Sequence, residues 1–160
     1  MRAVVQRVRE ARVAVAGRMV GQIGPGLLVY VGVGRDDDAS AADRLADKVA
    51  GLRIFSDADG KLNRSVRDVR GGVLAVPNFT LMADARKGRR PAFTDAAPPR
   101  QAQTLYERFL RGLTQRECTV EAGTFGAHML VHSVADGPVN LLLEMPPDAP
   151  SATATGRGAG

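Results

Sequence analysis

The sequence predicts a single α+β domain that combines about eight or more strands with two helices. Strand-like apolar runs fill residues 2–34 and recur between residues 120 and 143, whereas helical spacing of apolar residues is confined to two segments. Strands and helices therefore do not alternate regularly, which argues against a repeated strand–helix–strand fold.

The composition is that of a single globular domain. The chain has 160 residues, of which 44% are apolar and 4% aromatic, with no Trp, so Val, Leu, Ala and Ile must fill the core. No apolar run approaches the roughly 18 residues of a membrane span, and the first residues lack the apolar segment of a signal peptide. Cys118 is the only cysteine, so we expect no intrachain disulfide and a cytoplasmic location.

The net charge favours an anionic partner such as RNA. There are 22 Lys and Arg residues against 17 Asp and Glu, which gives a formal charge of +5. Four cations fall within five residues, and this cluster is more informative than the total: Arg86, Lys87, Arg89 and Arg90.

The N-terminal part of the chain is expected to form strands joined by tight turns. Leu27–Val33 is continuously apolar and so predicts a central strand, and Gly32 and Gly34 suggest that another backbone approaches it closely. Gly17-Arg18 is expected to link the second and third strands as a hairpin. The other strands expected here are Ala3–Val8, Ala11–Ala16 and Met19–Ile23.

Two segments have the apolar spacing of amphipathic helices. The first is entered through an acidic run and a capping-box-like pattern at Ser40–Asp43, and the second is announced by Pro98-Pro99. Between the helices, Asp57–Gly60 resembles half of a calcium loop but lacks the closing Glu, so we interpret it as a hairpin turn. The apolar positions are Ala42, Leu45, Ala46, Val49 and Leu52 in the first helix, and Ala102, Leu105, Tyr106, Phe109, Leu110 and Leu113 in the second.

The stretch from Val73 to Phe93 has the features of a functional site. An apolar strand, Val73–Val76, ends at Pro77 and is followed by Asn78, Phe79 and Thr80, then by the basic loop of residues 86–90. Such an arrangement can present backbone N–H groups and a hydroxyl to a reacting group and hold phosphates beside it. The alternative is an edge strand followed by a solvated basic turn.

Side chains suited to catalysis are otherwise scarce. His128 and His132 are the only histidines. No carboxylate or cysteine lies near them in the sequence to complete a set of metal ligands, so the pair does not predict a metal site. Further strands are expected at Val120–Ala122, Met129–His132 and Val139–Leu143. A turn at Gly137-Pro138 should precede the last strand, and X–Pro is the bond at which a cis peptide is cheap.

Collinear segments along residues 1–144 resemble the D-aminoacyl-tRNA deacylase family, and residues 145–160 form a Pro-, Ala- and Gly-rich tail that we expect to be disordered. The resemblance is carried by MRAVVQRV at the start, IGPGLLVYVGVG at 23–34, LADKVAGLRIFSDADGKLNRSV at 45–66, FTLMADARKGRRPAFTDAAPP at 79–99, LYERF at 105–109, FGAHM at 125–129 and DGPV at 136–139.

The resemblance implies a homodimer with a barrel-like α+β fold, a mixed and largely antiparallel sheet, and no cofactor or metal. It implies hydrolysis of the ester that joins a D-amino acid, or glycine mischarged onto tRNA(Ala), to the terminal adenosine of tRNA. Water would attack with help from the ribose 2′-OH, while the amides of Phe79 and Thr80 stabilise the oxyanion.

The same resemblance assigns the site residues. Asn78, Phe79 and Thr80 fall at the catalytic position, and Gly137, Pro138, Phe125 and Met129 fall around the substrate. A cis Gly137-Pro138 bond would enter the partner subunit's pocket, where its carbonyls reject L-amino acids. Arg86, Lys87, Arg89 and Arg90 would bind the tRNA phosphates.

Four positions depart from the family's two signatures. Pro77 and Asn78 stand where Ser and Gln are usual, and Ala135 and Asn140 stand where Asn and Thr are usual. A related animal deacylase, which carries a trans Gly-Pro and clears L-alanine from tRNA, also has Pro at the signature position that Pro77 occupies. The departures leave the prediction of an ester hydrolase in place and open two alternatives, which are a paralogue with relaxed or altered chirality and a module that binds tRNA 3′ ends without turnover. A third alternative is a basic structural protein whose charges serve ribosome or RNA association.

Overall fold

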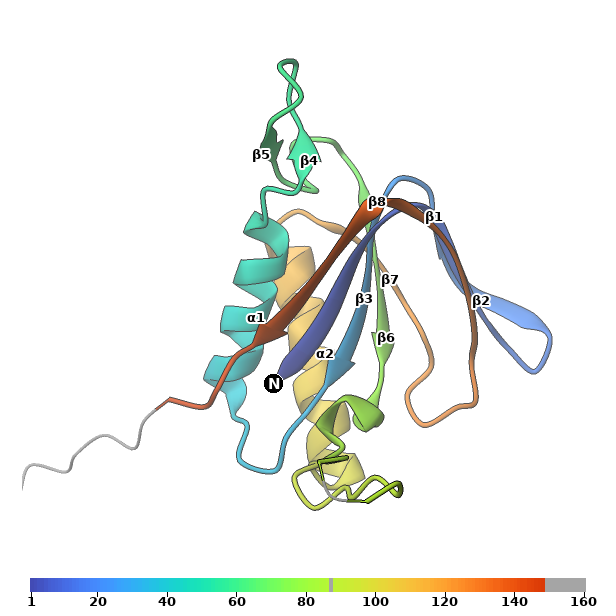
Figure 1. Ribbon diagram of the computed structural model, residues 1–160, viewed down its shortest axis with the longest axis vertical. Coiled ribbons are helices and arrows are strands. Elements are labelled where there is room, and N and C mark those ends of the chain that lie inside the picture. Colours follow the sequence, from blue (N-terminus) through green and yellow to red (C-terminus); the bar gives the residue numbers. More distant parts are fainter. Residues whose placement is uncertain (87, 149–160) are drawn as a thin grey trace, which may run out of the picture.

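The computed structural model describes residues 1–86 and 88–148 and shows a strongly curved, barrel-like sheet with two helices on one side (Figure 1). The six-stranded sheet has the order β2-β1-β3-β6-β7, with β8 paired to the other edge of β1, and β4 and β5 form a separate hairpin. The elements are β1 (Arg2–Val15), β2 (Arg18–Ile23), β3 (Gly26–Gly32), α1 (Ala39–Gly51), β4 (Phe55–Ser56), β5 (Leu62–Arg64), β6 (Gly72–Pro77), the 3-10 helix η1 (Phe79–Met82), α2 (Pro99–Gln115), β7 (Thr119–Ala122) and β8 (Leu130–Glu144).

The predicted fold class is confirmed in its α+β character and its mixed sheet. β1 pairs antiparallel with β2, β3 and β8, whereas β3–β6 and β6–β7 are parallel. Because β6 lies between β3 and β7, the alternative in which it is an edge strand is wrong. Both of its neighbours keep this strand buried and hold its end, Pro77, at a defined place in the sheet.

Two expected strand breaks are absent. Residues 3–8 and 11–16 were expected as separate strands but form the single strand β1, and the pair expected at 129–132 and 139–143 forms the single strand β8. β1 and β8 pair with each other along most of their length, and this backbone pairing keeps each strand extended through its polar residues. Local periodicity does not reveal such pairing. The hairpin after β1 also turns at Ala16 (φ 48°) and Gly17 (φ 78°), one residue earlier than expected.

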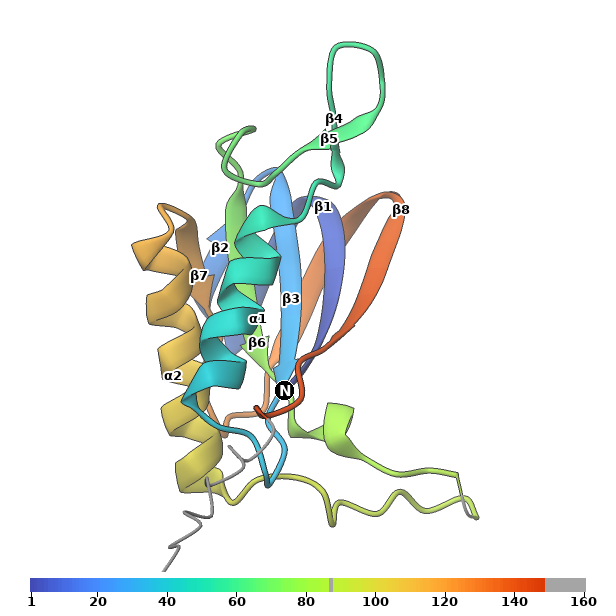
Figure 2. The same cartoon turned by 90° about the vertical axis from the view of Figure 1, so that its left-hand side faces the viewer.

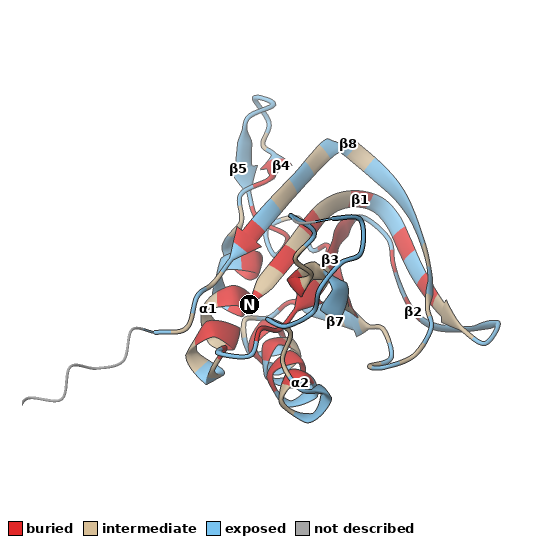
Figure 3. Cartoon of the chain, turned by 60° about the horizontal axis from the view of Figure 1, so that its bottom comes forward, coloured by how far each residue is buried: buried red, intermediate tan, exposed pale blue. Residues whose placement is uncertain are grey.

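The two helices cover one face of the sheet with the apolar stripes that the sequence predicts (Figure 2). Leu45 and Val49 of α1 and Phe109 and Leu113 of α2 are completely buried (Figure 3). The start of α1 differs from the expectation, because Asp38 is the N-cap and accepts a 2.8 Å hydrogen bond from the Ala41 amide. Ser40 lies inside the helix, so the predicted capping pattern is shifted by two residues.

Close packing of η1 against β3 depends on glycine. A Cβ atom at Gly32 would lie 2.9 Å from Leu81 Cβ and 3.1 Å from the Asn78 carbonyl oxygen, and one at Gly34 would lie 2.9 Å from Met82 Cε. The close approach predicted from these glycines is therefore confirmed. It places the residues that follow Pro77 directly on the end of β3.

The two ends of the described chain meet at the start of α1. The Met1 ammonium group pairs with the buried Asp37 carboxylate, and the Met145 amide donates to the Met1 carbonyl at 2.8 Å. Of the expected tail, residues 145–148 lie against this region, where Asp148 pairs with Arg44 at 3.3 Å, and residues 149–160 fall outside the described residues. Within the described ranges, no helix is long and apolar enough to cross a membrane.

Candidate active site

The candidate site begins where the parallel strands β3 and β6 end. The Asn78 amide donates to the Val31 carbonyl at 2.8 Å, which extends the strand pairing one residue beyond Pro77. Asn78 then serves as the N-cap of η1, since its Oδ1 accepts a 3.2 Å hydrogen bond from the Thr80 amide and another from the Thr80 hydroxyl. The Phe79 amide donates to no acceptor in the part of the chain that the structure describes.

A cavity of about 560 Å³ opens beside this turn. Its walls are mainly apolar and aromatic, and Arg35 is the one charged residue among its lining residues. Such walls suit a planar ring that makes few polar contacts. The lining residues are Val31, Val33, Arg35, Pro77, Asn78, Phe79, Phe93, Ala96, Ala97, Pro98, Pro99, Ala102, Tyr106, Phe125, Gly126, Ala127 and Met129.

Aromatic contacts and one buried hydrogen bond shape the cavity. The rings of Phe79 and Phe93 lie 5.0 Å apart, and those of Tyr106 and Phe125 lie 6.3 Å apart. The Tyr106 hydroxyl donates to the Ala75 carbonyl at 2.9 Å, and burial raises the pKa of Tyr106 well above its ordinary value. Tyr106 is therefore neutral at physiological pH, and its hydroxyl fixes the ring in the wall of the cavity through the bond to Ala75.

Gly137-Pro138 lies in a bend of β8 and has the cis bond that the resemblance implies. Asn140 pairs with Gln6 and Ala135 with Val8, so Asp136–Val139 bulge out opposite a single residue, Arg7. The chain therefore bends within a strand, whereas a turn ahead of the last strand was expected.

Arg7 braces this bend. Its guanidinium group donates to the Asp136 carbonyl at 3.1 Å and to the Ile54 carbonyl at 2.6 Å, and it pairs with the Asp136 carboxylate at 3.4 Å. No sequence pattern predicts this role, because Arg7 is 129 residues away from Asp136 in the chain. The bend lies at the top of the sheet in Figure 1, whereas η1 lies near the bottom, and Gly137 and Pro138 are not lining residues of the cavity in their own chain.

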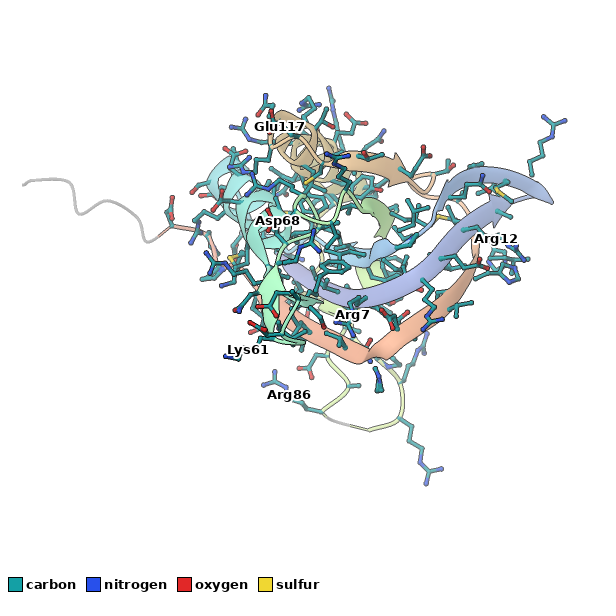
Figure 4. The ribbon with its side chains drawn as sticks, turned by 90° about the horizontal axis from the view of Figure 1, so that it is seen from above. Arg7, Arg12, Lys61, Asp68, Arg86 and Glu117 are labelled. Atoms are coloured by element: carbon teal, nitrogen blue, oxygen red, sulfur yellow. The ribbon has the colours of Figure 1, made fainter. Side chains whose placement is uncertain are left out.

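The basic loop projects from the domain beyond η1 and is closed by backbone hydrogen bonds between Asp84 and Ala92 at 2.8 and 2.9 Å (Figure 4). Arg86 is turned back onto Asp84 by two side-chain bonds of 2.9 and 2.7 Å, and this pairing lowers the pKa of the Asp84 carboxyl. Arg89 and Arg90 are exposed, and Lys87 lies outside the described residues. The four cations of the loop are therefore not equivalent, since Arg86 already has an anionic partner.

The remaining candidate residues are not assembled into a site. Among residues 1–86 and 88–148, no three His, Cys, Asp or Glu side chains gather closely enough to hold a metal ion. Cys118 is buried, and burial raises the pKa of its thiol. Neither it nor the two histidines line the cavity.

The structure thus brings together four of the residues that the sequence singles out: Asn78, Phe79, Phe125 and Met129. Thr80 is exposed and joins this group through its hydrogen bonds to Asn78. Sequence reasoning missed Arg35, Phe93 and Tyr106 as lining residues. Only the position of Phe93 close behind the basic loop was available as a signal.

Comparison with known proteins gives the class of this fold and site. A family model described as D-Tyr-tRNA(Tyr) deacylase matches residues 4–144. D-aminoacyl-tRNA deacylases from Thermotoga petrophila and Symbiobacterium thermophilum are 58% and 56% identical to this chain over 144 residues. These alignments cover 90% of this chain and 97% and 95% of the respective relatives.

Solved structures agree. One described as c-Myc DNA Unwinding Element Binding Protein has a TM-score of 0.86 at 39% identity, and the match covers 91% of this chain and 99% of the chain in that structure. A probable eukaryotic D-amino acid tRNA deacylase has a TM-score of 0.76 at 19% identity, covering 89% and 97%, and shows a shared fold. The chain belongs to the D-Tyr-tRNA(Tyr) deacylase family, as its sequence segments had indicated.

The brace at the β8 bend leads to a stability prediction. Arg7→Met removes the bonds to the Ile54 and Asp136 carbonyls, and we expect a loss of about 1.5–3 kcal/mol in the free energy of unfolding. Amide hydrogen exchange at residues 136–140 should accelerate as well. Urea unfolding and exchange measured by mass spectrometry would test both.

Arg9→Met is the matched control. Arg9 lies 3.9 Å from the Asp136 carboxylate with a side chain that is 77% exposed, so its loss should cost no more than about 0.5 kcal/mol. Equal, small effects in the two variants would show that Arg7 does not hold the bend.

Proposed function

We propose that this chain hydrolyses the ester bond between a D-amino acid, or glycine mischarged onto tRNA(Ala), and the 3′-terminal adenosine of tRNA. Family membership makes it a hydrolase that acts on aminoacyl-tRNA ester bonds. The observation that carries the finer proposal is the apolar, aromatic cavity beside an uncommitted backbone donor, the Phe79 amide.

The chemistry would depend on backbone groups and on the substrate. A developing oxyanion would accept a hydrogen bond from the Phe79 amide, and a donor of this kind typically contributes about 2.7–4 kcal/mol to catalysis. The Thr80 hydroxyl donates to Asn78 Oδ1, and within the described residues it makes no hydrogen bond to a His, Asp or Glu side chain that could activate it as a nucleophile. Water attack assisted by the ribose 2′-OH fits a site with this set of groups.

Different parts of the site would bind the unpaired terminal base of the tRNA and the phosphates of its acceptor stem. The rings of Phe79, Phe93, Tyr106 and Phe125 offer stacking surfaces of the kind that bind an unpaired base. The exposed cations Arg89 and Arg90 lie on the projecting loop, where phosphates of the acceptor stem would pass.

Chirality would be decided by a second copy of the chain. Gly137-Pro138 is remote from its own cavity, so it can contribute to a site only by entering another subunit. Carbonyl oxygens from this bend would accept the substrate ammonium group and leave no room for an L side chain. β8 is suited to carry such an interface, because Leu130, Val134 and Leu142 are exposed along it.

The direct test is deacylation of D-Tyr-tRNA, L-Tyr-tRNA and Gly-tRNA(Ala) by substoichiometric protein. We expect many turnovers with the D and glycyl esters and none with the L ester. The reaction should collapse on D-Tyr-tRNA that ends in 2′-deoxyadenosine, which serves as the control for ribose assistance. Protection of the ester would identify a binding module, and cleavage of L-Ala-tRNA would identify the paralogue of altered chirality.

A composite site predicts complementation between two inactive chains. Phe79→Pro removes the backbone donor, and Gly137→Ala adds a Cβ atom that would lie only 2.5 Å from the Val139 nitrogen. A mixed dimer purified with two affinity tags has one intact site, so we expect about half of the wild-type rate. An inactive mixed dimer whose thermal unfolding matches that of the wild type would place both groups in the same subunit's site.

The basic loop predicts a change in salt dependence. Arg89→Ala should weaken tRNA binding and reduce the slope of log K against log salt by about 0.7–0.9, the value for one phosphate contact. Lys61→Ala, in the β4–β5 hairpin at the other end of the domain, is the control of equal charge (Figure 1). Equal slopes for wild type and Arg89→Ala would remove Arg89 from the tRNA interface.

A further inference from the structure

The orientation of the Asn78 carboxamide follows from the groups that it contacts. The main-chain N–H of Thr80 can only donate, so the atom that faces it at 3.2 Å must be the oxygen, Oδ1. The Thr80 hydroxyl donates to the same oxygen. The planar carboxamide therefore has its oxygen turned toward Thr80 and its nitrogen, Nδ2, on the opposite side.

Nδ2 of Asn78 is left available by this arrangement. It has no acceptor within the described residues, and Asn78 is half-buried in the wall of the cavity beside Phe79. An amide nitrogen without a protein partner is free to donate a hydrogen bond to a ligand that enters the cavity, in exchange for the bond it makes to water. The cavity is the place where such a ligand would lie.

The Thr80 amide, in contrast, is already used. Because it donates to Asn78 Oδ1, the turn retains one uncommitted main-chain donor, which is the Phe79 amide. Asparagine side chains readily bond the amide two residues ahead, so this pairing is a property of Asn at position 78. A single donor would leave the charge of a tetrahedral intermediate only partly balanced.

We propose that Nδ2 of Asn78 is the second donor to the oxyanion, in the place of the Thr80 amide. This inference rests on the proposed ester hydrolysis and gives a side chain the role of oxyanion donor, beside the Phe79 amide of the backbone. Oδ1 holds the carboxamide in place through its two bonds from Thr80, and Nδ2 pairs with the carbonyl oxygen of the ester as that oxygen gains charge.

Asn78→Asp separates this role from that of a helix cap. Asp retains the oxygen that accepts from Thr80 and is as good an N-cap as Asn, so the melting temperature should stay equal or rise. It lacks the N–H donor, so kcat for D-Tyr-tRNA should fall about 10²–10³-fold, while KM changes about twofold at most. A residue that only caps η1 would leave kcat unchanged.

Protonation restores a donor to the acid and supplies an independent readout. A carboxylic acid donates one hydrogen bond, and well above its ordinary pKa its protonated fraction grows about tenfold for each unit by which pH falls. The ratio of the Asn78→Asp rate to the wild-type rate should therefore increase as pH falls from 7.5 to 5, by up to about tenfold for each pH unit. Gln22→Glu, the same change of a carboxamide to a carboxylate at an exposed residue of β2, controls for added negative charge and should keep a constant ratio.

A wild-type kcat in Asn78→Asp, or a lowered kcat whose ratio to wild type does not rise as pH falls, overturns the assignment. The activity of the wild-type chain is measured first and tests the proposed function separately. The inference concerns only the ratio of variant to wild type.

Discussion

The pairing of β1 with three other strands is the constraint on which the rest of the structure depends. The first half of β1 pairs with β3, its second half pairs with β2, and its other edge pairs with β8 along nearly its whole length. One strand therefore fixes the position of both functional regions. β3 supports the turn at Asn78, and the interrupted register with β8 produces the bend at Gly137-Pro138.

The cavity of the candidate site is lined almost entirely by uncharged side chains. The cavity is lined by aromatic and aliphatic side chains, a neutral tyrosine and one carboxamide, with Arg35 as its charged residue. Outside the cavity, the projecting loop carries the exposed cations Arg89 and Arg90, whereas Arg86 is partly neutralised by Asp84. This division suits a reaction in which an anionic polymer is held outside and a developing negative charge is stabilised by oriented hydrogen-bond donors inside.

Several elements could be predicted from the sequence because their signals are local. The apolar stripes of α1 and α2, the buried run of β3 and the stop of β6 at Pro77 each depend on residues close together in the chain. The continuity of β1 and β8 and the interior position of β6 depend instead on strand partners supplied by distant segments. The same is true of the brace between Arg7 and the β8 bend, whose members share no sequence pattern.

The sequence by itself determined the family, the glycines that let η1 approach β3, and the identity of Asn78, Phe79 and Thr80 as the residues at the strand end. The tertiary structure decided what those residues can do. Whether an amide is free or already bonded depends on the direction of each side chain, and the Asn78 carboxamide takes its direction from the backbone path after Pro77. That path is set by the packing of η1 on β3, in which Gly32 lies against Leu81, 49 residues further along the chain. The glycines signal a close approach, but no local pattern says which segment makes it.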